Sequence, residues 1–414
     1  MLLLLILLLI LPAPQLVTDS VSIASAPRRL LVRGVNWLGD AVMTTPALLR
    51  LREALPGTHV TLLTHEKLTG LWAGHPAVDD VLPFGSAENV FQIAQRLRRA
   101  SFDTALILPN SIRSALEARL AGIPRRIGYA GSWRNWLLTR AVPLRSDVVK
   151  MRKRTPEEVR RLVAEADRGR GLRPLEGSSH DQLANGVTPL VPASSHHLFH
   201  YLHLAAAFGA RPEPLAPFVA VSAADVLAVK AKFNLPEGLL IGLNAGAEYG
   251  PAKRWPAEHF IATAQQLRAR LKCGFVIFGG PADSELASRI ASALAPPSEP
   301  RASATSVVSN LAGRTSLREL CAAMRACRVV LTNDTGPMHV AAAVGARVVG
   351  LFGSTSIELT GPGLPGDARN FLLRGTAPCA PCFLRECPVD FRCMKDLTVE
   401  RVSAAVEQAA THPA

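Results

Sequence analysis

The sequence predicts an α/β protein with two similar halves, each a doubly wound parallel sheet covered by helices. The chain has 414 residues, which at roughly 100–200 residues per domain suggests two domains. Short apolar runs alternate with segments of helical spacing, and this rhythm stops and then resumes on the far side of the Pro-rich linker "RPEPLAPFVA". Hydrophobic residues make up 48% and aromatic residues 5% of the chain, a mixture that suits α/β layers better than an aromatic-rich β-sandwich.

The first 27 residues form an apolar extension that begins with "MLLLLILLLILPAPQLV". Its unbroken apolar run is shorter than the roughly 20 residues that a membrane-spanning helix needs, and no Lys or Arg precedes Arg28 as a signal peptide would require. A weak anchor, an unusual signal or a start codon placed too far upstream would each explain it. We favour the last, so that the chain proper begins near Arg28.

Residues 28–215 are expected to form the N-terminal half. Leu30–Val32 predict a first strand, and a Gly-containing loop leads into a helix from Ala41 to Leu55 that ends at Pro-Gly. "HVTLLTH" and "FDTALILPN" predict two further strands, with the helical segment "VFQIAQRLRRA" between them. Residues 145–195 interrupt this rhythm with a basic insert, either a mobile segment for an anionic surface or a solvated helix and loop. "HHLFHYLHLAAAFGA" then predicts the helix that closes this half.

Residues 216–395 are expected to form the C-terminal half. The runs "LLIGLNAGA", "GFVIFGG", "RVVLTND" and "RVVGLFG" predict four of its strands. A last helix within residues 396–414 could pack back on the N-terminal half.

Polar clusters come directly after several of the predicted strands: residues 36–40, 244–253, 279–283 and 333–339. In open parallel sheets, ligands bind beyond the carboxyl ends of the strands. The sequence therefore predicts a cleft between the halves that is lined by loops from both.

The cluster "NDTGPMH" lies between a predicted strand and a predicted helix. A helix start carries unpaired N–H groups and partial positive charge, Gly allows close approach to the backbone, and Pro suits the first turn. Such a terminus can bind phosphate. The alternative is an ordinary N-cap in which Asp334 or Thr335 only stabilises the helix.

The cluster "NAGAEYGPAKRWP" places Lys253 and Arg254 on a loop after another strand. Two cations among small residues suit a pyrophosphate, although an exposed basic surface loop is the alternative. In "NWLGD", Asp40 stands at a helix start, where it is either a first-turn carboxylate or a general base acting on a hydroxyl. "GVNWLG" lacks the second glycine of the dinucleotide motif, which argues against a nicotinamide or flavin enzyme.

Four of the seven cysteines lie together in "CAPCFLRECPVDFRC". They are Cys379, Cys382, Cys387 and Cys393, and their spacing resembles a structural zinc site without matching a common zinc module. A cytosolic location would disfavour disulfides. Structural zinc, disulfides and free thiols all stay open.

The formal net charge is +13 and the sequence pI is about 10.0. A basic surface attracts nucleic acid, anionic lipid or phosphorylated substrates. Arginine serving simply as the solvated surface residue is an equally good interpretation.

Taken together, these motifs resemble the ADP-heptose:lipopolysaccharide heptosyltransferases, glycosyltransferase family 9, and most closely the heptosyltransferase II type. "NAGAEYGPAKRWP" resembles the family's "PGAEFGPAKRWP", and "NDTGPMHVAAAVG" resembles "NDSGLMHVAAAL". "RGVNWLGDAVMTTPALLRLR" is similar to the "WVGDMVMSQSL" loop and helix, and "VIFGGPADSE" to the segment after the next strand. The matches run from about residue 30 to residue 352. Pro337 departs from the leucine of many members, and the basic insert has no firm counterpart.

The resemblance implies a GT-B-like fold of two Rossmann-like domains that face a cleft, with the donor held mainly by the C-terminal domain. It implies an inverting transfer of L-glycero-D-manno-heptose from ADP-heptose to a heptose on the Kdo–lipid A inner core, with no cofactor required for catalysis. The enzyme would lie in the cytoplasm, peripherally on the anionic inner-membrane surface. No nucleic acid partner is expected.

The resemblance also assigns roles to residues. Asp40 matches the catalytic base, and Lys253 matches the lysine that neutralises the pyrophosphate. The remaining substrate-binding candidates are Asn36, Gly39, Arg254, Asp283, Asp334, Thr335, Gly336, Pro337, Met338 and His339.

Two alternatives stay open. One is another sugar-nucleotide glycosyltransferase of the same fold with a different donor or acceptor. The other is a non-catalytic polyanion-binding protein that uses the basic insert and a zinc site.

Overall fold

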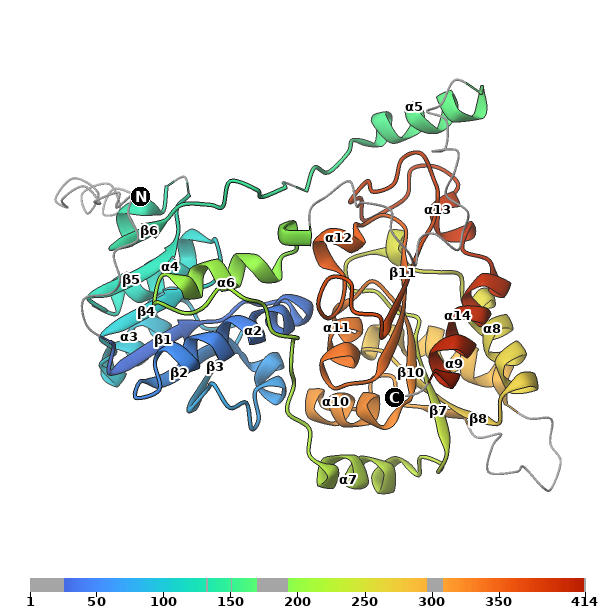
Figure 1. The fold of residues 1–414 in the computed structure, drawn as a ribbon, viewed down its shortest axis with the longest axis horizontal. Coiled ribbons are helices and arrows are strands. Elements are labelled where there is room, and N and C mark those ends of the chain that lie inside the picture. Colours follow the sequence, from blue (N-terminus) through green and yellow to red (C-terminus); the bar gives the residue numbers. More distant parts are fainter. Residues whose placement is uncertain (1–25, 132, 150, 170–192, 296–307, 413–414) are drawn as a thin grey trace. The chain divides into compact units, whose positions relative to one another are not determined.

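The computed structural model describes residues 26–131, 133–149, 151–169, 193–295 and 308–412, and the chain divides into two compact units. Unit 1 comprises the described residues within Met1–Asn36, Thr44–Val148 and Leu198–Pro214. Unit 2 comprises those within Trp37–Met43, Val149–His197 and Leu215–Ala414. Figure 1 shows the ribbon of each unit with most of its helices and strands labelled.

Unit 1 is built on a parallel six-stranded sheet with the strand order β3-β2-β1-β4-β5-β6. Its strands are β1 (Arg29–Arg33), β2 (His59–His65), β3 (Asp80–Phe84), β4 (Thr104–Ile107), β5 (Arg125–Tyr129) and β6 (Arg140–Val142). The first strand lies in the middle and later strands add on both sides, which is the doubly wound arrangement that the sequence predicts. Leu30, Leu31 and Val32 of β1 are fully buried, because both faces of such a sheet are covered.

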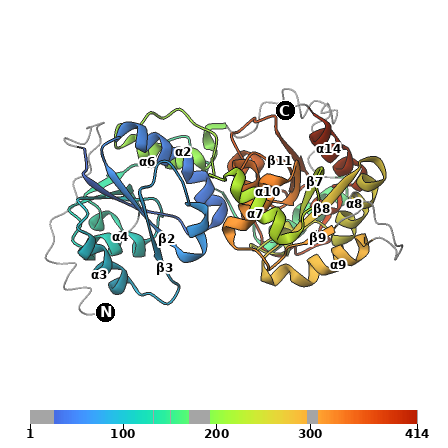
Figure 2. The same cartoon turned by 90° about the horizontal axis from the view of Figure 1, so that it is seen from below.

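Helices α2 (Leu38–Ala54), α3 (Val90–Ala100), α4 (Ile112–Leu120) and α6 (Leu198–Ala206) accompany this sheet. Helix α2 spans the division between the units, because its first residues are assigned to unit 2. Helix α3 begins with a capping box. The Asn89 side chain accepts hydrogen bonds from backbone N–H groups of the first turn, and the Gln92 side chain accepts one from the Asn89 backbone N–H. Helices α3 and α4 contact each other and lie side by side in Figure 2. Their apolar faces bury Ile93, Leu97 and Ala115 in one core cluster.

Unit 2 repeats this architecture with the parallel order β12-β11-β10-β7-β8-β9. Its strands are β7 (Leu239–Asn244), β8 (Cys273–Phe278), β9 (Val308–Asn310), β10 (Val329–Asn333), β11 (Arg347–Phe352) and β12 (Asn370–Arg374). Its helices are α5 (Pro156–Asp167), α7 (Ala223–Phe233), α8 (Ala257–Arg270), α9 (Ser284–Leu294), α10 (Leu317–Ala326), α11 (Gly336–Ala343), α12 (Ile357–Thr360), α13 (Arg392–Lys395) and α14 (Val399–Thr411).

The basic insert does not belong to the N-terminal half as expected. The described residues within Val149–His197 are assigned to unit 2. The reason is that α5 buries Val159 and Val163 in a small apolar cluster with Cys379, Cys382 and Leu384. The part of the insert from residue 170 to residue 192 lies outside the described residues.

The last helix, which was expected to pack on the N-terminal half, belongs to unit 2. Helix α14 buries Val402, Val406 and Ala409 in the core of unit 2, and it contacts α8 and β11 there. In Figure 1 it lies in red beside the yellow α8.

The apolar extension of residues 1–27 lies almost wholly outside the described residues, which begin at residue 26. Among the helices in the described part of the chain, none is both long and apolar enough to cross a membrane.

Candidate functional site

Three loops of unit 2 carry most of the predicted site residues, and they leave the sheet at the same edge. Strands β8, β7 and β10 are parallel neighbours, so their carboxyl ends lie side by side. The loop after β7 carries Lys253, the turn after β8 carries Asp283, and β10 runs directly into Asp334. The prediction that polar clusters gather at strand ends is confirmed for these three loops.

Lys253 and Asp334 form a largely buried ion pair. Lys253 Nζ lies 2.6 Å from Asp334 Oδ2, and the side chains are 14% and 4% exposed. The hydroxyl of Thr355 donates to the same carboxylate oxygen at 2.5 Å. The ammonium also lies 5.0 Å from the centre of the Tyr249 ring, within range of a cation–π interaction. These contacts hold one cation in a defined place at the edge of the sheet.

Helix α11 starts directly after Asp334. Thr335 is its N-cap residue, and the Thr335 side chain makes no capping hydrogen bond. The Oδ2 atom of Asp334 accepts hydrogen bonds from Lys253 and Thr355 and does not cap the helix. The structure thus disfavours the interpretation of "NDTGPMH" as an ordinary side-chain cap. A helix start of this kind presents positive backbone charge next to the Lys253 ammonium.

The residues inside this helix start differ in what they can offer a ligand. Gly336 and Pro337 are partly exposed at its first turn. Met338 is fully buried, and its N–H donates to the Thr335 carbonyl at 3.0 Å. The predicted role of Met338 in holding phosphate therefore gains no support from its surroundings.

The start of α2 packs against α11 within unit 2. A Cβ atom added to Gly39 would lie 2.8 Å from Cδ2 of His339, and one added to Gly336 would lie 2.9 Å from Leu38 Cβ. Both positions need glycine because the two chain segments approach so closely. His339 is buried, and burial lowers its pKa to about 4, so the imidazole is neutral at physiological pH.

Asp40 comes directly after Gly39 on the same segment. Burial raises the pKa of its carboxyl from 3.8 to about 6, and the positive charge of Lys253 acts in the opposite direction. A carboxyl with this pKa is ionised at neutral pH but takes up a proton readily, as a general base must. Lys253 thus interacts electrostatically with both Asp40 and His339 inside unit 2.

Arg254 and Asp283 make a weaker pair beside this centre. Arg254 Nη2 lies 3.5 Å from Asp283 Oδ1, and the other carboxylate oxygen accepts from the Gly280 N–H at 3.1 Å. The Asp283 carboxylate lies against the backbone of Gly246, where any side chain would collide with it. Asp283 therefore packs against the start of the loop that carries Lys253 and helps to fix its position.

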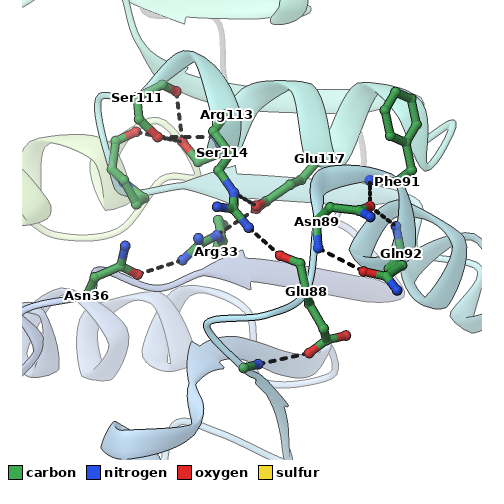
Figure 3. Close-up of polar contacts among 12 residues, drawn as sticks. Arg33, Asn36, Glu88, Asn89, Phe91, Gln92, Ser111, Arg113, Ser114 and Glu117 are labelled. Carbon is green, nitrogen blue, oxygen red and sulfur yellow. Dashed lines mark hydrogen bonds and ion pairs between the residues drawn. The ribbon is translucent and has the colours of Figure 1, made fainter.

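Asn36 belongs to unit 1, unlike Gly39 and Asp40. Its amide oxygen accepts from Arg33 Nη1 at 3.2 Å, and Arg33 Nε pairs at 2.8 Å with the fully buried Glu117. Glu117 also accepts from Arg113 at 3.1 Å, and Figure 3 shows this network of side chains around the Arg33 guanidinium. Sequence reasoning missed Arg33 and Glu117, because neither lies in an obvious polar cluster after a strand.

The four clustered cysteines lie in one segment of unit 2. Cys379, Cys382 and Cys393 are buried, and all seven cysteines of the chain are free thiols. Burial, and after it the charges of the neighbouring thiolates, raises the pKa of Cys393 to about 12. In the part of the chain that the structure describes, no group of three or more His, Cys, Asp or Glu side chains is arranged to hold a metal ion.

Three further residues shape the site: Thr355 was not predicted, while Tyr249 and Asn333 lie in predicted polar clusters but were given no role. Thr355 comes after β11 in the polar run "GSTS", so the rule that finds polar residues at strand ends could have found it. Tyr249 lies inside a motif singled out for its cations alone. The Asn333 side chain donates to Ala245 O at 2.7 Å and accepts from Trp255 N at 3.0 Å, closing both ends of the Lys253 loop. Only the fold brings these atoms together.

Comparisons with known proteins agree on one family. A model of glycosyltransferase family 9 (heptosyltransferase) matches residues 90–165 and 175–391. Lipopolysaccharide heptosyltransferase 2 of Salmonella typhimurium is 32% identical over 347 residues, which cover 81% of this chain and 85% of that protein. The protein of the same name from Escherichia coli K12 is 30% identical over 346 residues, with 81% and 85% covered.

Solved structures agree as well. The structure of E. coli ADP-heptose lps heptosyltransferase II matches with a TM-score of 0.66 and 26% identity, covering 92% of this chain and 98% of that one. A family 9 glycosyl transferase from Veillonella parvula matches in fold with a TM-score of 0.69 at 21% identity, covering 95% and 100%. The predicted α/β, GT-B-like fold class with two Rossmann-like sheets is thereby confirmed. The chain belongs to glycosyltransferase family 9, the heptosyltransferase family.

Proposed function

We propose that this glycosyltransferase moves L-glycero-D-manno-heptose from ADP-heptose to a heptose on the Kdo–lipid A inner core of lipopolysaccharide. The names of its relatives support an ADP-heptose donor and a lipopolysaccharide acceptor. The observation that carries the proposal is the buried Lys253–Asp334 pair beside the start of α11, where the N-cap side chain does not cap the helix.

The donor diphosphate would lie against Lys253 and the first turn of α11. Negative charge builds on the diphosphate as its bond to the sugar breaks, and fixed positive charge lowers the energy of that transition state. Lys253 supplies a full charge, and the helix start at Thr335 and Gly336 supplies partial charge and N–H donors. Catalysis would then need no cofactor.

Asp40 would act as the base. The acceptor hydroxyl oxygen attacks the anomeric carbon from the face opposite the diphosphate, the carbon–oxygen bond to the diphosphate breaks, and the hydroxyl proton passes to the Asp40 carboxylate. This step inverts the anomeric centre and releases ADP. A pKa of about 6 suits Asp40 to the task, because the carboxylate is ionised at neutral pH and still basic enough to accept the proton.

We further propose that the protein works peripherally on the anionic cytoplasmic face of the inner membrane. The net charge of +13 supports electrostatic attraction to anionic lipid. Trp133 is 81% exposed and Leu144 is 47% exposed, and both line an open, mostly apolar pocket of about 710 Å³ in unit 1. Tryptophan at such a position suits the boundary between lipid headgroups and acyl chains.

Vesicle co-sedimentation tests this association. We expect binding to vesicles with anionic lipid at low salt, weaker binding at high salt, and a further loss in Trp133→Ala. Phe91→Ala, which removes another exposed aromatic side chain elsewhere in unit 1, is the matched control. Binding that ignores both salt and Trp133 would contradict the proposal.

A structural zinc ion held by Cys379, Cys382, Cys387 and Cys393 also stays a proposal. Burial raises the pKa of Cys379 and Cys393, and the negative charge of neighbouring thiolates raises it further. A bound divalent cation would stabilise the thiolate forms. Because the described positions do not form a metal-holding group, zinc would have to draw the segment together. Metal analysis of protein purified without chelator tests this: one zinc per chain, lost in Cys382→Ser, is expected, and protein free of zinc contradicts it.

The proposed reaction is tested with purified protein and a panel of ADP-, GDP- and UDP-sugars, followed by mass spectrometry of a heptosylated Kdo–lipid A acceptor. We expect one heptose to be added from ADP-heptose alone. Transfer from another nucleotide sugar would favour the alternative of a related glycosyltransferase. Strong, salt-sensitive binding of DNA or RNA without any ADP-heptose binding would favour a polyanion-binding protein instead.

A further inference from the structure

The loop that carries Lys253 is held at three points. Asn333 fixes its two ends through hydrogen bonds to Ala245 and Trp255. The third point is the tip, residues 249–252, which contacts residues 382–385 of the Cys-rich segment. The tip matters most for Lys253, because it lies directly before that residue in the chain.

Two hydrogen bonds and one ring contact join the tip to this segment. The Tyr249 hydroxyl donates to Phe383 O at 2.8 Å, and the Ala252 N–H donates to Arg385 O at 2.9 Å. The Arg385 guanidinium lies 5.2 Å from the centre of the Tyr249 ring, and Lys253 Nζ lies 5.0 Å from the same centre. The Tyr249 ring therefore contacts both the cation of the site and a cation of the Cys-rich segment.

Glycine makes this close contact feasible. A Cβ atom at Gly250 would lie 2.5 Å from the carbonyl oxygen of Arg385, so only glycine lets the two backbones meet. The contact is therefore built into the sequence of the loop.

The same segment also reaches the partner of Lys253. The N–H groups of Cys382 and Phe383 both donate to Ser354 O, at 3.1 and 2.7 Å. Ser354 precedes Thr355, whose hydroxyl donates to Asp334. Residues 382–385 thus contact both the loop that carries the ammonium and the chain that fixes the carboxylate.

Helix α5 and the residues before it also contact the Cys-rich segment. The Arg154 N–H donates to Cys382 O at 3.0 Å, and Arg392 makes two bonds to Asp167 at 2.7 and 3.1 Å. The buried cluster of Val159 and Val163 with Cys382 adds apolar contact. These contacts hold the Cys-rich segment in place independently of its contacts with the Lys253 loop.

We propose that residues 382–385 of the Cys-rich segment position Lys253 through Tyr249, and thereby set the affinity of the site for a nucleoside diphosphate. Tyr249 is a positioning residue in this proposal, because it acts on the ligand through the ammonium. The inference rests on the proposed role of Lys253 at the donor diphosphate.

A double-mutant cycle with ADP as the probe tests the proposal. The dissociation constant for ADP is measured by calorimetry for the wild type, Tyr249→Phe and Tyr249→Leu, each with Lys253 and with Lys253→Met. Tyr249→Phe removes one neutral hydrogen bond, so we expect ADP binding to weaken about two- to tenfold. Tyr249→Leu also removes the ring and should weaken it more.

The cycle separates positioning from general stability. If Tyr249 acts through the ammonium, neither substitution should weaken ADP binding more than about twofold once Lys253→Met is present. The same loss in both backgrounds would overturn the proposal and make Tyr249 a structural residue only. Phe91→Leu, in unit 1, controls for loss of an aromatic side chain, and Tyr249→Phe is conservative enough to keep the test valid should Tyr249→Leu not fold.

The same measurements distinguish a wrong role for Tyr249 from a wrong role for Lys253. If Lys253→Met alone leaves ADP affinity unchanged, Lys253 is not a diphosphate ligand, and the proposed function and this inference fall together. If Lys253→Met weakens ADP binding but the Tyr249 variants match the wild type, only the positioning role is wrong.

Discussion

Lys253 and Asp334 form an ion pair of 2.6 Å in which the carboxylate is 4% and the ammonium 14% exposed. Water and salt screen such a pair little. Asp334 is 81 positions away in sequence and reaches Lys253 because β7 and β10 are neighbouring parallel strands. The pair keeps a charged ammonium in place at the sheet edge before any ligand arrives, so the positive charge is preorganised.

Lys253→Met is expected to lower kcat/KM by about 10²- to 10³-fold, because one charge that stabilises the leaving diphosphate is lost. Steady-state kinetics with ADP-heptose check this. Lys232→Met is the matched control, since it removes an exposed lysine whose partner is Glu319. The double variant Lys253→Met with Asp334→Asn should be as slow as Lys253→Met alone. If the double variant recovered activity, the loss of activity in Lys253→Met would come from the unpaired Asp334 carboxylate and not from the missing ammonium.

The pH profile of kcat/KM should show an acid limb near pH 6, because Asp40 must be ionised to accept a proton and its pKa is raised to about 6. Lys253 lowers that pKa, so Lys253→Met should move the limb to higher pH. Profiles measured between about pH 5 and pH 8 check both points. A limb that stays in place in the variant would contradict the coupling of the two residues.

Asp40→Asn should make the protein more stable at pH 8 than the wild type. Burial raises the folded-state pKa from 3.8 to about 6, so an ionised Asp40 destabilises the fold above pH 6, by on the order of 1–3 kcal/mol. Below pH 4 the carboxyl is protonated in both states, and the advantage should vanish. Thermal unfolding at several pH values checks this, and a gap independent of pH would argue against a buried carboxylate.

Gly39→Ala should lower thermal stability, because the new methyl group would lie 2.8 Å from the His339 ring. Gly57→Ala is the control, since a Cβ there meets no atom within 4 Å. His339→Ala should relieve the clash, so that adding Gly39→Ala to it costs less than it does in the wild type. Equal costs in both backgrounds would mean that the two residues do not meet.

Much of the fold could be predicted from the sequence, because central strands of a parallel sheet are buried on both faces and appear as apolar runs. Strands β1, β2, β4, β7, β8, β10 and β11 obey this rule. Strand β3 was missed because it lies at a sheet edge, is partly exposed and contains Pro83. Strand β5 was missed because it begins with two arginines. The buried Arg126 is accommodated there by hydrogen bonds to the Leu137 and Ile123 carbonyls.

The site was predictable where one stretch of chain carries the chemistry, as in the motifs around Lys253 and Asp334. It was not predictable where distant segments meet. The hydrogen bond from Tyr249 to Phe383 joins residues 134 positions apart, and no local sequence pattern predicts it. The place of the basic insert depends in the same way on the contact of α5 with the Cys-rich segment.

Transfer by Asp40→Asn, measured together with ADP-heptose affinity on the same preparation, tests the proposed chemistry most directly. Asparagine keeps the shape of the side chain but cannot accept the proton. We expect kcat at saturating donor to fall at least about 10²-fold while donor affinity stays within about twofold of the wild type. Turnover close to that of the wild type would contradict the assignment of Asp40 as the base.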